Sequence, residues 1–90
     1  MKVVINTCYG GFSVSKAVYD YLGIPWDNYG YINLERNDPT LIAAIEAVGL
    51  EAAAGRYAQL KIVDIPEDIE WYIDEYDGME SIHENHKVWD

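Results

Sequence analysis

This chain of 90 residues has a single cysteine, few basic residues and no long apolar stretch. The lone Cys8 excludes an internal disulfide and leaves the redox compartment only weakly indicated. No segment approaches the roughly 20 apolar residues needed to span a membrane. The first residues also hold too short an apolar run for a secretory signal peptide. We therefore expect a soluble cytoplasmic protein.

The sequence also lacks internal repeats, low-complexity segments and linkers. Neither a P-loop nor a G-x-G-x-x-G fingerprint is present, so we expect no cofactor. Half of the residues are hydrophobic, and eight tyrosines and three tryptophans are among them, which is enough apolar material for one core. Residues 1–90 are therefore predicted to form one small domain.

The net charge of −10 is concentrated in the last third of the chain. Residues 1–63 carry six acids and five bases, whereas residues 64–90 carry ten acids against Lys87 alone. Such a field repels nucleic acid and anionic membranes and attracts basic protein surfaces. Two interpretations stay open: a solubilising face, or a surface that imitates the charge of nucleic acid.

The pattern of apolar residues predicts an α+β fold with the element order β-α-β-α-β-β-α. Strands are expected over Lys2–Thr7, Tyr29–Glu35, Ala58–Ile65 and Ile69–Tyr76. Helices are expected from Ser13 or Ser15 to Gly23, from Asp38-Pro39 to Gly49 with a further turn or two up to Gly55, and from Met79 onward. The strands would form one mixed sheet of about four strands, with the helices packed on one face.

The last two strands are predicted to pair as an antiparallel hairpin because only Pro66–Asp68 connects them. Within the second of them, Ile69, Trp71 and Ile73 alternate with polar residues, which predicts one buried and one wet face. Asp77-Gly78 is then expected to turn the chain into the final helix. That helix would carry the following residues: Met79, Ile82, His83, His86 and Trp89.

The stretch "NTCYGGFSVS" after the first strand has three possible roles. Cys8 would be a nucleophile if His83 or His86 supplied a base, although no protease-type signature surrounds it. Gly10-Gly11 before a helix start would bind an anion through backbone N–H groups. The third role is a plain structural turn, which the residues alone favour.

Two further groups of side chains are candidate sites. His83 and His86, with Glu80 one turn earlier, would share a helix face and form a metal site, or else pack against the sheet. Glu70 and Asp74 on the last strand are better interpreted as a solvated face than as a catalytic carboxylate pair, because a small sheet lacks the cleft that such a pair needs.

The motifs "INTCYGGFSVS" and "DIEWYIDEYDGMESIHENHKVW" resemble those of a family of small acidic proteins from bacteriophages and prophages. The resemblance runs from Lys2 to Trp89 and includes the D-P-x-L helix and the "LKIV-x-IP" strand. It implies a phage-encoded accessory protein in the host cytoplasm, of the kind used against host defence. It assigns no catalytic or binding residue.

The leading hypothesis is a non-enzymatic protein that sequesters a small anionic ligand, such as a nucleotide immune signal, and acts as a homodimer or larger. The floor of its site would be Asn6, Tyr9, Gly10, Gly11, Phe12 and Ser13, with Arg36 or Arg56 for charge and an aromatic residue such as Trp26 for stacking. Lys16 is a further base near the glycine loop, which Tyr9, Phe12, Trp26 and Tyr29 flank in the sequence. The alternative is an inhibitor of a basic host nuclease or nucleic-acid-binding complex, acting through Glu70, Asp74, Glu75 and Asp77. A Cys8-dependent enzyme is the third hypothesis. No direct contact with nucleic acid or membrane is expected.

Overall fold

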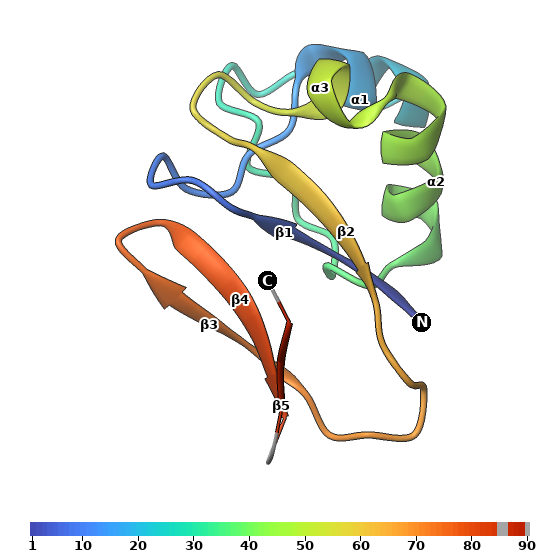
Figure 1. The fold of residues 1–90 in the computed structure, drawn as a ribbon. Helices are drawn as coiled ribbons and strands as arrows, with labels where there is room; N and C mark the ends of the chain where they lie inside the picture. The colour runs from blue at the N-terminus through green and yellow to red at the C-terminus, as the bar shows by residue number, and fades with distance from the viewer. Residues whose placement is uncertain (85–86, 90) are drawn as a thin grey trace.

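The chain is arranged in three layers, with helices on one side, a two-stranded sheet in the middle and a three-stranded sheet on the other side (Figure 1). The computed structural model describes residues 1–84 and 87–89. The elements are β1 (Lys2–Asn6), α1 (Lys16–Leu22), α2 (Pro39–Val48), α3 (Leu50–Ala53), β2 (Leu60–Asp64), β3 (Tyr72–Tyr76), β4 (Met79–Glu84) and β5 (Lys87–Trp89). The predicted α+β class is confirmed.

The middle layer is apolar on both of its faces. Strands β1 and β2 pair antiparallel, from Lys2 opposite Asp64 to Asn6 opposite Leu60. Val4 and Leu60 face the helices and lie in the first hydrophobic core. Val3, Ile5, Val63 and Ile65 face the three-stranded sheet and, with Ile82, form the second core. The buried first strand expected from the sequence is therefore confirmed, and it belongs to two cores at once.

The helices begin and end where the local sequence predicts. The carboxylate of Asp38 accepts a hydrogen bond from the amide of Thr40 at 2.8 Å, and Pro39 takes the first helical position of α2. Gly23 ends α1 with a φ of 72°, in the left-handed region that favours glycine. Gly49 separates α2 from the single turn of α3.

The strand predicted over Tyr29–Glu35 is wrong, because this segment is an irregular loop. Gly30 has a φ of 81°, which interrupts an extended run. The side chains of Tyr29 and Tyr31 are 71% and 70% exposed, so the aromatic residues that suggested a strand are not packed into a sheet.

The single four-stranded sheet is also wrong, because the strands divide into a sheet of order β1-β2 and a sheet of order β3-β4-β5. Strand β2 pairs with β1, and β3 pairs with β4, so the expected β2–β3 hairpin does not form. The connection instead crosses between sheets, and Ile69, Trp71 and Ile73 pack on the second core. Their alternation with exposed Tyr72 and Asp74 is confirmed.

The predicted final helix is replaced by strands β4 and β5. Asp77 and Gly78 have φ angles of 54° and 88°, the pair of positive values that a tight hairpin turn requires. This turn directs Met79 back along β3, with Tyr76 opposite Met79. Within the described part of the chain, no helix has the length and apolar character to cross a membrane. His86 lies outside the described residues.

Candidate functional site

Asn6, the first residue of the predicted ligand site, ties three chain segments together. Its side chain is fully buried, and its Nδ2 donates to the carbonyls of Cys8 at 2.6 Å and Gly78 at 2.7 Å. Its Oδ1 accepts from the backbone amide of Gln59 at 2.9 Å. All polar atoms of this side chain are thus used within the fold, which is the role of a structural residue.

The glycine pair allows close approach of two loops. A Cβ atom on Gly10 would lie 1.8 Å from the carbonyl oxygen of Tyr57, and Gly11 has a φ of 86°. Helix α1 starts five residues after this pair, and the Oγ of Ser15 donates to the carbonyl of Ala52 at 2.6 Å instead of capping the helix. The structure therefore separates the glycine turn from the helix start, while Tyr9 is 62% exposed beside the turn.

Arg36 is engaged in a partly buried ion pair. Its Nη1 and Nη2 donate to the two carboxylate oxygens of Glu80 at 2.6 and 2.8 Å, and the guanidinium lies 3.5 Å from the centre of the Phe12 ring. The carbonyl of Arg36 and the carboxylate of Glu80 also accept the amides of Val4 and Asn6. Arg36 and Glu80 thus cover the edge of β1 that β2 leaves unpaired, and Phe12 packs on the Arg36 guanidinium.

The structure does bring two predicted ligand residues, Trp26 and Arg56, to the same surface cavity, which has a volume of about 280 Å³. Lys16, Asn28 and Tyr29 also line it, together with Ser15 and the chain at Ala54 and Gly55. Of the other predicted site residues, Ser13 is buried beneath Gly55, and the remainder lie outside the lining of this cavity.

The cavity has cationic and aromatic walls. Arg56 has no carboxylate partner among the described residues, and its guanidinium lies 5.5 Å from the centre of the Tyr57 ring. The Nζ of Lys16 is 3.1 Å from Asp20 in an exposed pair. Trp26 packs edge-on against Tyr19, with ring centres 4.9 Å apart. An anion with a planar group finds complementary chemistry here.

Asp27 fixes the loop that forms one wall of the cavity. Its Oδ1 accepts the amides of Tyr29 and Gly30 at 2.8 and 2.7 Å, and its Oδ2 accepts the phenol of Tyr19 at 3.0 Å. The hydrogen bond from the Gly30 amide, and then those from the Tyr29 amide and the Tyr19 phenol, lower the pKa of Asp27. Burial and then Asp27 raise the pKa of Tyr19 to about 12. The intervening Asn28 adopts a φ of 71°, so the signal for this wall in the sequence is the Asp27-Asn28 pair, which is typical of such turns.

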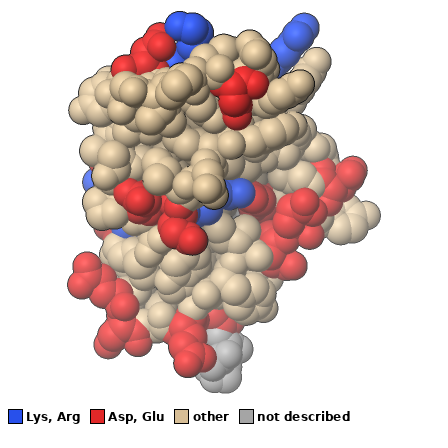
Figure 2. Space-filling model, turned by 180° about the vertical axis from the view of Figure 1, so that it is seen from behind, with Lys and Arg blue, Asp and Glu red and all other residues tan. Residues whose placement is uncertain are grey.

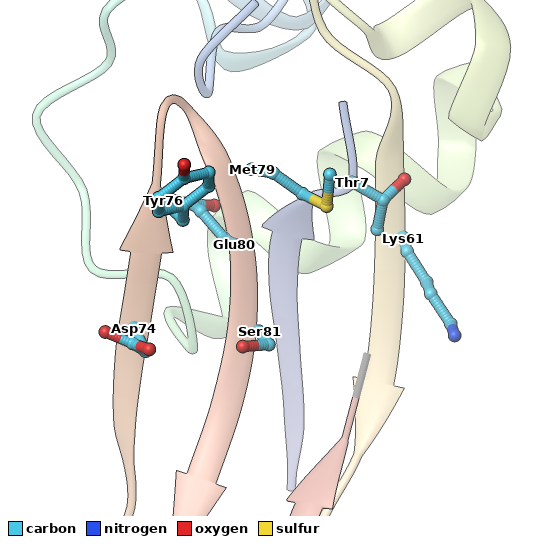
Figure 3. Close-up of a pocket in the computed structure, with 7 residues that line it drawn as sticks. All are labelled: Thr7, Lys61, Asp74, Tyr76, Met79, Glu80 and Ser81. Carbon is cyan, nitrogen blue, oxygen red and sulfur yellow. The ribbon is translucent and has the colours of Figure 1, made fainter. Parts of the chain in front are cut away.

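A second cavity, of about 470 Å³, lies where β3 and β4 meet β1 and β2 (Figure 3). Its lining is Thr7, Lys61, Asp74, Tyr76, Met79, Glu80 and Ser81. The Oγ of Ser81 is 2.8 Å from the Nε2 of His83, which is 3.7 Å from Asp74. Its lining holds the carboxylate of Asp74 beside one lysine, whereas the Glu80 carboxylate is paired with Arg36, so this cavity offers an anion less positive charge than the first cavity does.

The structure offers little for the cysteine and metal hypotheses. The thiol of Cys8 lies 2.8 Å from the carbonyl of Tyr57 and 3.3 Å from the Oδ1 of Asn6, and no described histidine contacts it. Because β4 is a strand, Glu80 and His83 lie on opposite faces. Among the described residues, no three histidine, cysteine or carboxylate side chains are grouped closely enough to hold a metal ion.

The acidic residues of the alternative hypothesis are all exposed. Glu70 precedes β3, Asp74 and Glu75 lie on it, and Asp77 is in the turn that follows. Figure 2 shows acidic side chains gathered over the lower half of the molecule, where the three-stranded sheet lies, with few basic side chains beside them. The structure therefore places the cavity with Trp26 and Arg56 in a different layer from these acidic residues. The predicted glycine turn, by contrast, lies against the Asp77-Gly78 turn, since Gly78 packs on the backbone of Tyr9 and Gly11.

No protein-family model, no curated protein and no solved structure matches this chain. The resemblance to small acidic phage proteins stays a prediction from the sequence motifs. The function is therefore inferred from the chemistry of the cavities and of the acidic strand.

Proposed function

We propose that the protein binds a small anionic molecule with a planar ring, of the nucleotide class, and sequesters it without catalysis. The site is the cavity lined by Lys16, Trp26, Asn28, Tyr29 and Arg56. The observation that carries this proposal is the convergence of two basic and two aromatic side chains on one cavity in a protein whose net charge is −10.

Each wall of the cavity has a distinct task in this proposal. The guanidinium of Arg56 would donate paired hydrogen bonds to a phosphate, and such charge-assisted bonds contribute about 1.5–3 kcal/mol each. The exposed pair of Lys16 with Asp20 contributes little by itself, so Lys16 is available to a phosphate. Stacking of a base on Trp26 or Tyr29 would add about 1–3 kcal/mol.

The biological setting comes from the sequence resemblance. A phage-encoded protein of this kind would act in the cytoplasm of the infected cell and withhold a nucleotide signal from a host defence effector. The cavity of about 280 Å³ is slightly smaller than the usual 300–1,000 Å³ of ligand sites. Enclosure of the ligand by a second copy of the chain, as in a homodimer, would supply the remaining contact surface.

The proposal is tested by amide NMR spectra of the protein titrated with mono-, di- and cyclic nucleotides and with inorganic phosphate. We expect shifts at Asn28–Gly30 and Gly55–Tyr57. Arg56→Ala should weaken nucleotide binding by about tenfold or more. Lys2→Ala, which removes the same charge from the exposed pair with Glu46, is the matched control and should bind normally.

The aromatic wall has its own control. Tyr29 is 71% exposed, so Tyr29→Ala should weaken nucleotide binding without unfolding the chain and leave phosphate binding unchanged. Tyr21, which is 56% exposed on α1 and does not line the cavity, provides the comparison. Equal affinity of wild type and Arg56→Ala for every probe, or no shift at the cavity with any probe, would contradict the proposed site.

A further inference from the structure

Strand β3 is an open edge of the three-stranded sheet. The sheet order is β3-β4-β5, so among the described strands β3 pairs with β4 alone. The pairing is uninterrupted from Tyr72 opposite His83 to Tyr76 opposite Met79. Such an edge presents a row of backbone N–H and C=O groups that another strand can pair with.

Among the described residues, the outer edge of β1 is covered, whereas no backbone hydrogen bond is made to the outer edge of β3. The outer edge of β1 is occupied, because the amide of Val4 donates to the carbonyl of Arg36 at 2.9 Å and the amide of Asn6 donates to Glu80 at 2.8 Å. Strand β3 has no proline, bulge or lysine, which are common ways of blocking an edge. What β3 does have is negative charge.

That charge determines which partner the edge accepts. Glu70, Asp74, Glu75 and Asp77 are exposed along it, and residues 64–84 contain no lysine or arginine. A second copy of this chain, with its own charge of −10, would be repelled at this edge, whereas a basic segment would be attracted.

The side chains of β3 fit a basic strand. Asp74 lies between Tyr72 and Tyr76 on one face, and these tyrosines are 57% and 78% exposed. A lysine or arginine directly opposite Asp74 on an added strand would lie about 5 Å away. Its neighbours at alternate positions would lie over the two tyrosine rings, where a cation is stabilised.

We propose that β3 binds an extended basic segment of a partner protein by strand addition. This surface belongs to the outer sheet, whereas the nucleotide cavity lies in the helical layer, so the two activities are independent. The acidic residues favour a positively charged partner, and the backbone of β3 requires the bound segment to be extended.

The test uses a synthetic peptide of seven residues in which lysine alternates with threonine, titrated into the protein and followed by amide NMR and calorimetry. We expect binding with shifts along β3, weakening at high salt, and a loss of about fivefold in affinity for Asp74→Asn. Asp20→Asn, which removes the same charge from α1, is the control and should bind the peptide like wild type.

The peptide backbone distinguishes strand addition from simple charge attraction. N-methylation of alternate residues keeps every charge and removes donors along one edge of the peptide. In two isomers the methyl groups occupy opposite edges, so the isomer methylated on the pairing edge should lose binding and the other should keep it. Equal binding of both isomers and the parent peptide, or no binding of the parent, would overturn the proposal.

Discussion

Removal of the Glu80 carboxylate is expected to destabilise the fold by about 3–5 kcal/mol. Glu80 is 7% exposed and accepts bonds from Arg36 at 2.6 and 2.8 Å and from the amide of Asn6 at 2.8 Å. Glu80→Ala leaves these donors without partners at a largely buried site. Domains of 90 residues have total free energies of unfolding of roughly 5–13 kcal/mol, so the change is a large share of the total.

Urea unfolding of wild type and variant measures this loss. The control is Glu75→Ala, because Glu75 lies opposite Glu80 in the hairpin but is exposed, and its removal should change the free energy of unfolding by no more than about 0.5 kcal/mol. The double variant Arg36→Met with Glu80→Leu removes both charges and should recover part of the stability. A loss below about 1 kcal/mol for Glu80→Ala would refute the idea that this pair seals the edge of β1.

Three further predictions concern single contacts. Since burial and Asp27 raise the pKa of Tyr19 to about 12, the folded state keeps a proton that the unfolded chain loses. This stabilisation is therefore present below about pH 10 and is lost between about pH 10 and 12. Ultraviolet titration of the Asp27→Asn variant should show a lower pKa for Tyr19 than in the wild type. Gly10→Ala should reduce the urea midpoint more than Gly11→Ala, because only the first adds a methyl group against a backbone carbonyl; equal losses would contradict this reason. Asp38→Ala should cost about 1 kcal/mol by loss of the α2 cap, measured by the same unfolding, and an unchanged midpoint would count against the cap.

Local signals in the sequence were sufficient for the parts of the fold that depend on neighbouring residues. The Asp38-Pro39 start of α2, the Gly23 end of α1 and the alternation of Ile69, Trp71 and Ile73 are all present in the structure. Each follows from backbone geometry or from a periodicity of a few residues.

Elements that depend on distant partners were not predictable in this way. Residues 29–35 have the composition of a strand but pair with none of the described strands, and Arg36 and Glu80 cover the free edge of β1. The spacing of Met79 and Ile82 also suits a helix, but an Asp-Gly pair is equally typical of a tight hairpin turn, and in the structure it forms one.

The candidate site was predictable in its chemistry but not in its location. The sequence indicates Trp26 and Arg56 as an aromatic and a cation near the glycine turn, and the structure places them in one cavity that the two glycines do not line. The pairing of Arg36 with Glu80 joins residues 44 positions apart, and no local pattern reveals it. In the observed hairpin, Glu80 lies on the same buried strand face as Ile82. A carboxylate at such a position needs a partner of opposite charge, and this need is the signal in the sequence for the Arg36 pair.

The most direct test of the central claim is native mass spectrometry of the protein purified gently from infected bacterial cells, in parallel with Arg56→Ala. The account predicts a small-molecule adduct on the wild-type protein that is lost on denaturation and is absent from the variant. Its mass would identify the ligand. A bare wild-type protein, or an adduct carried equally by Arg56→Ala, would contradict sequestration at this cavity.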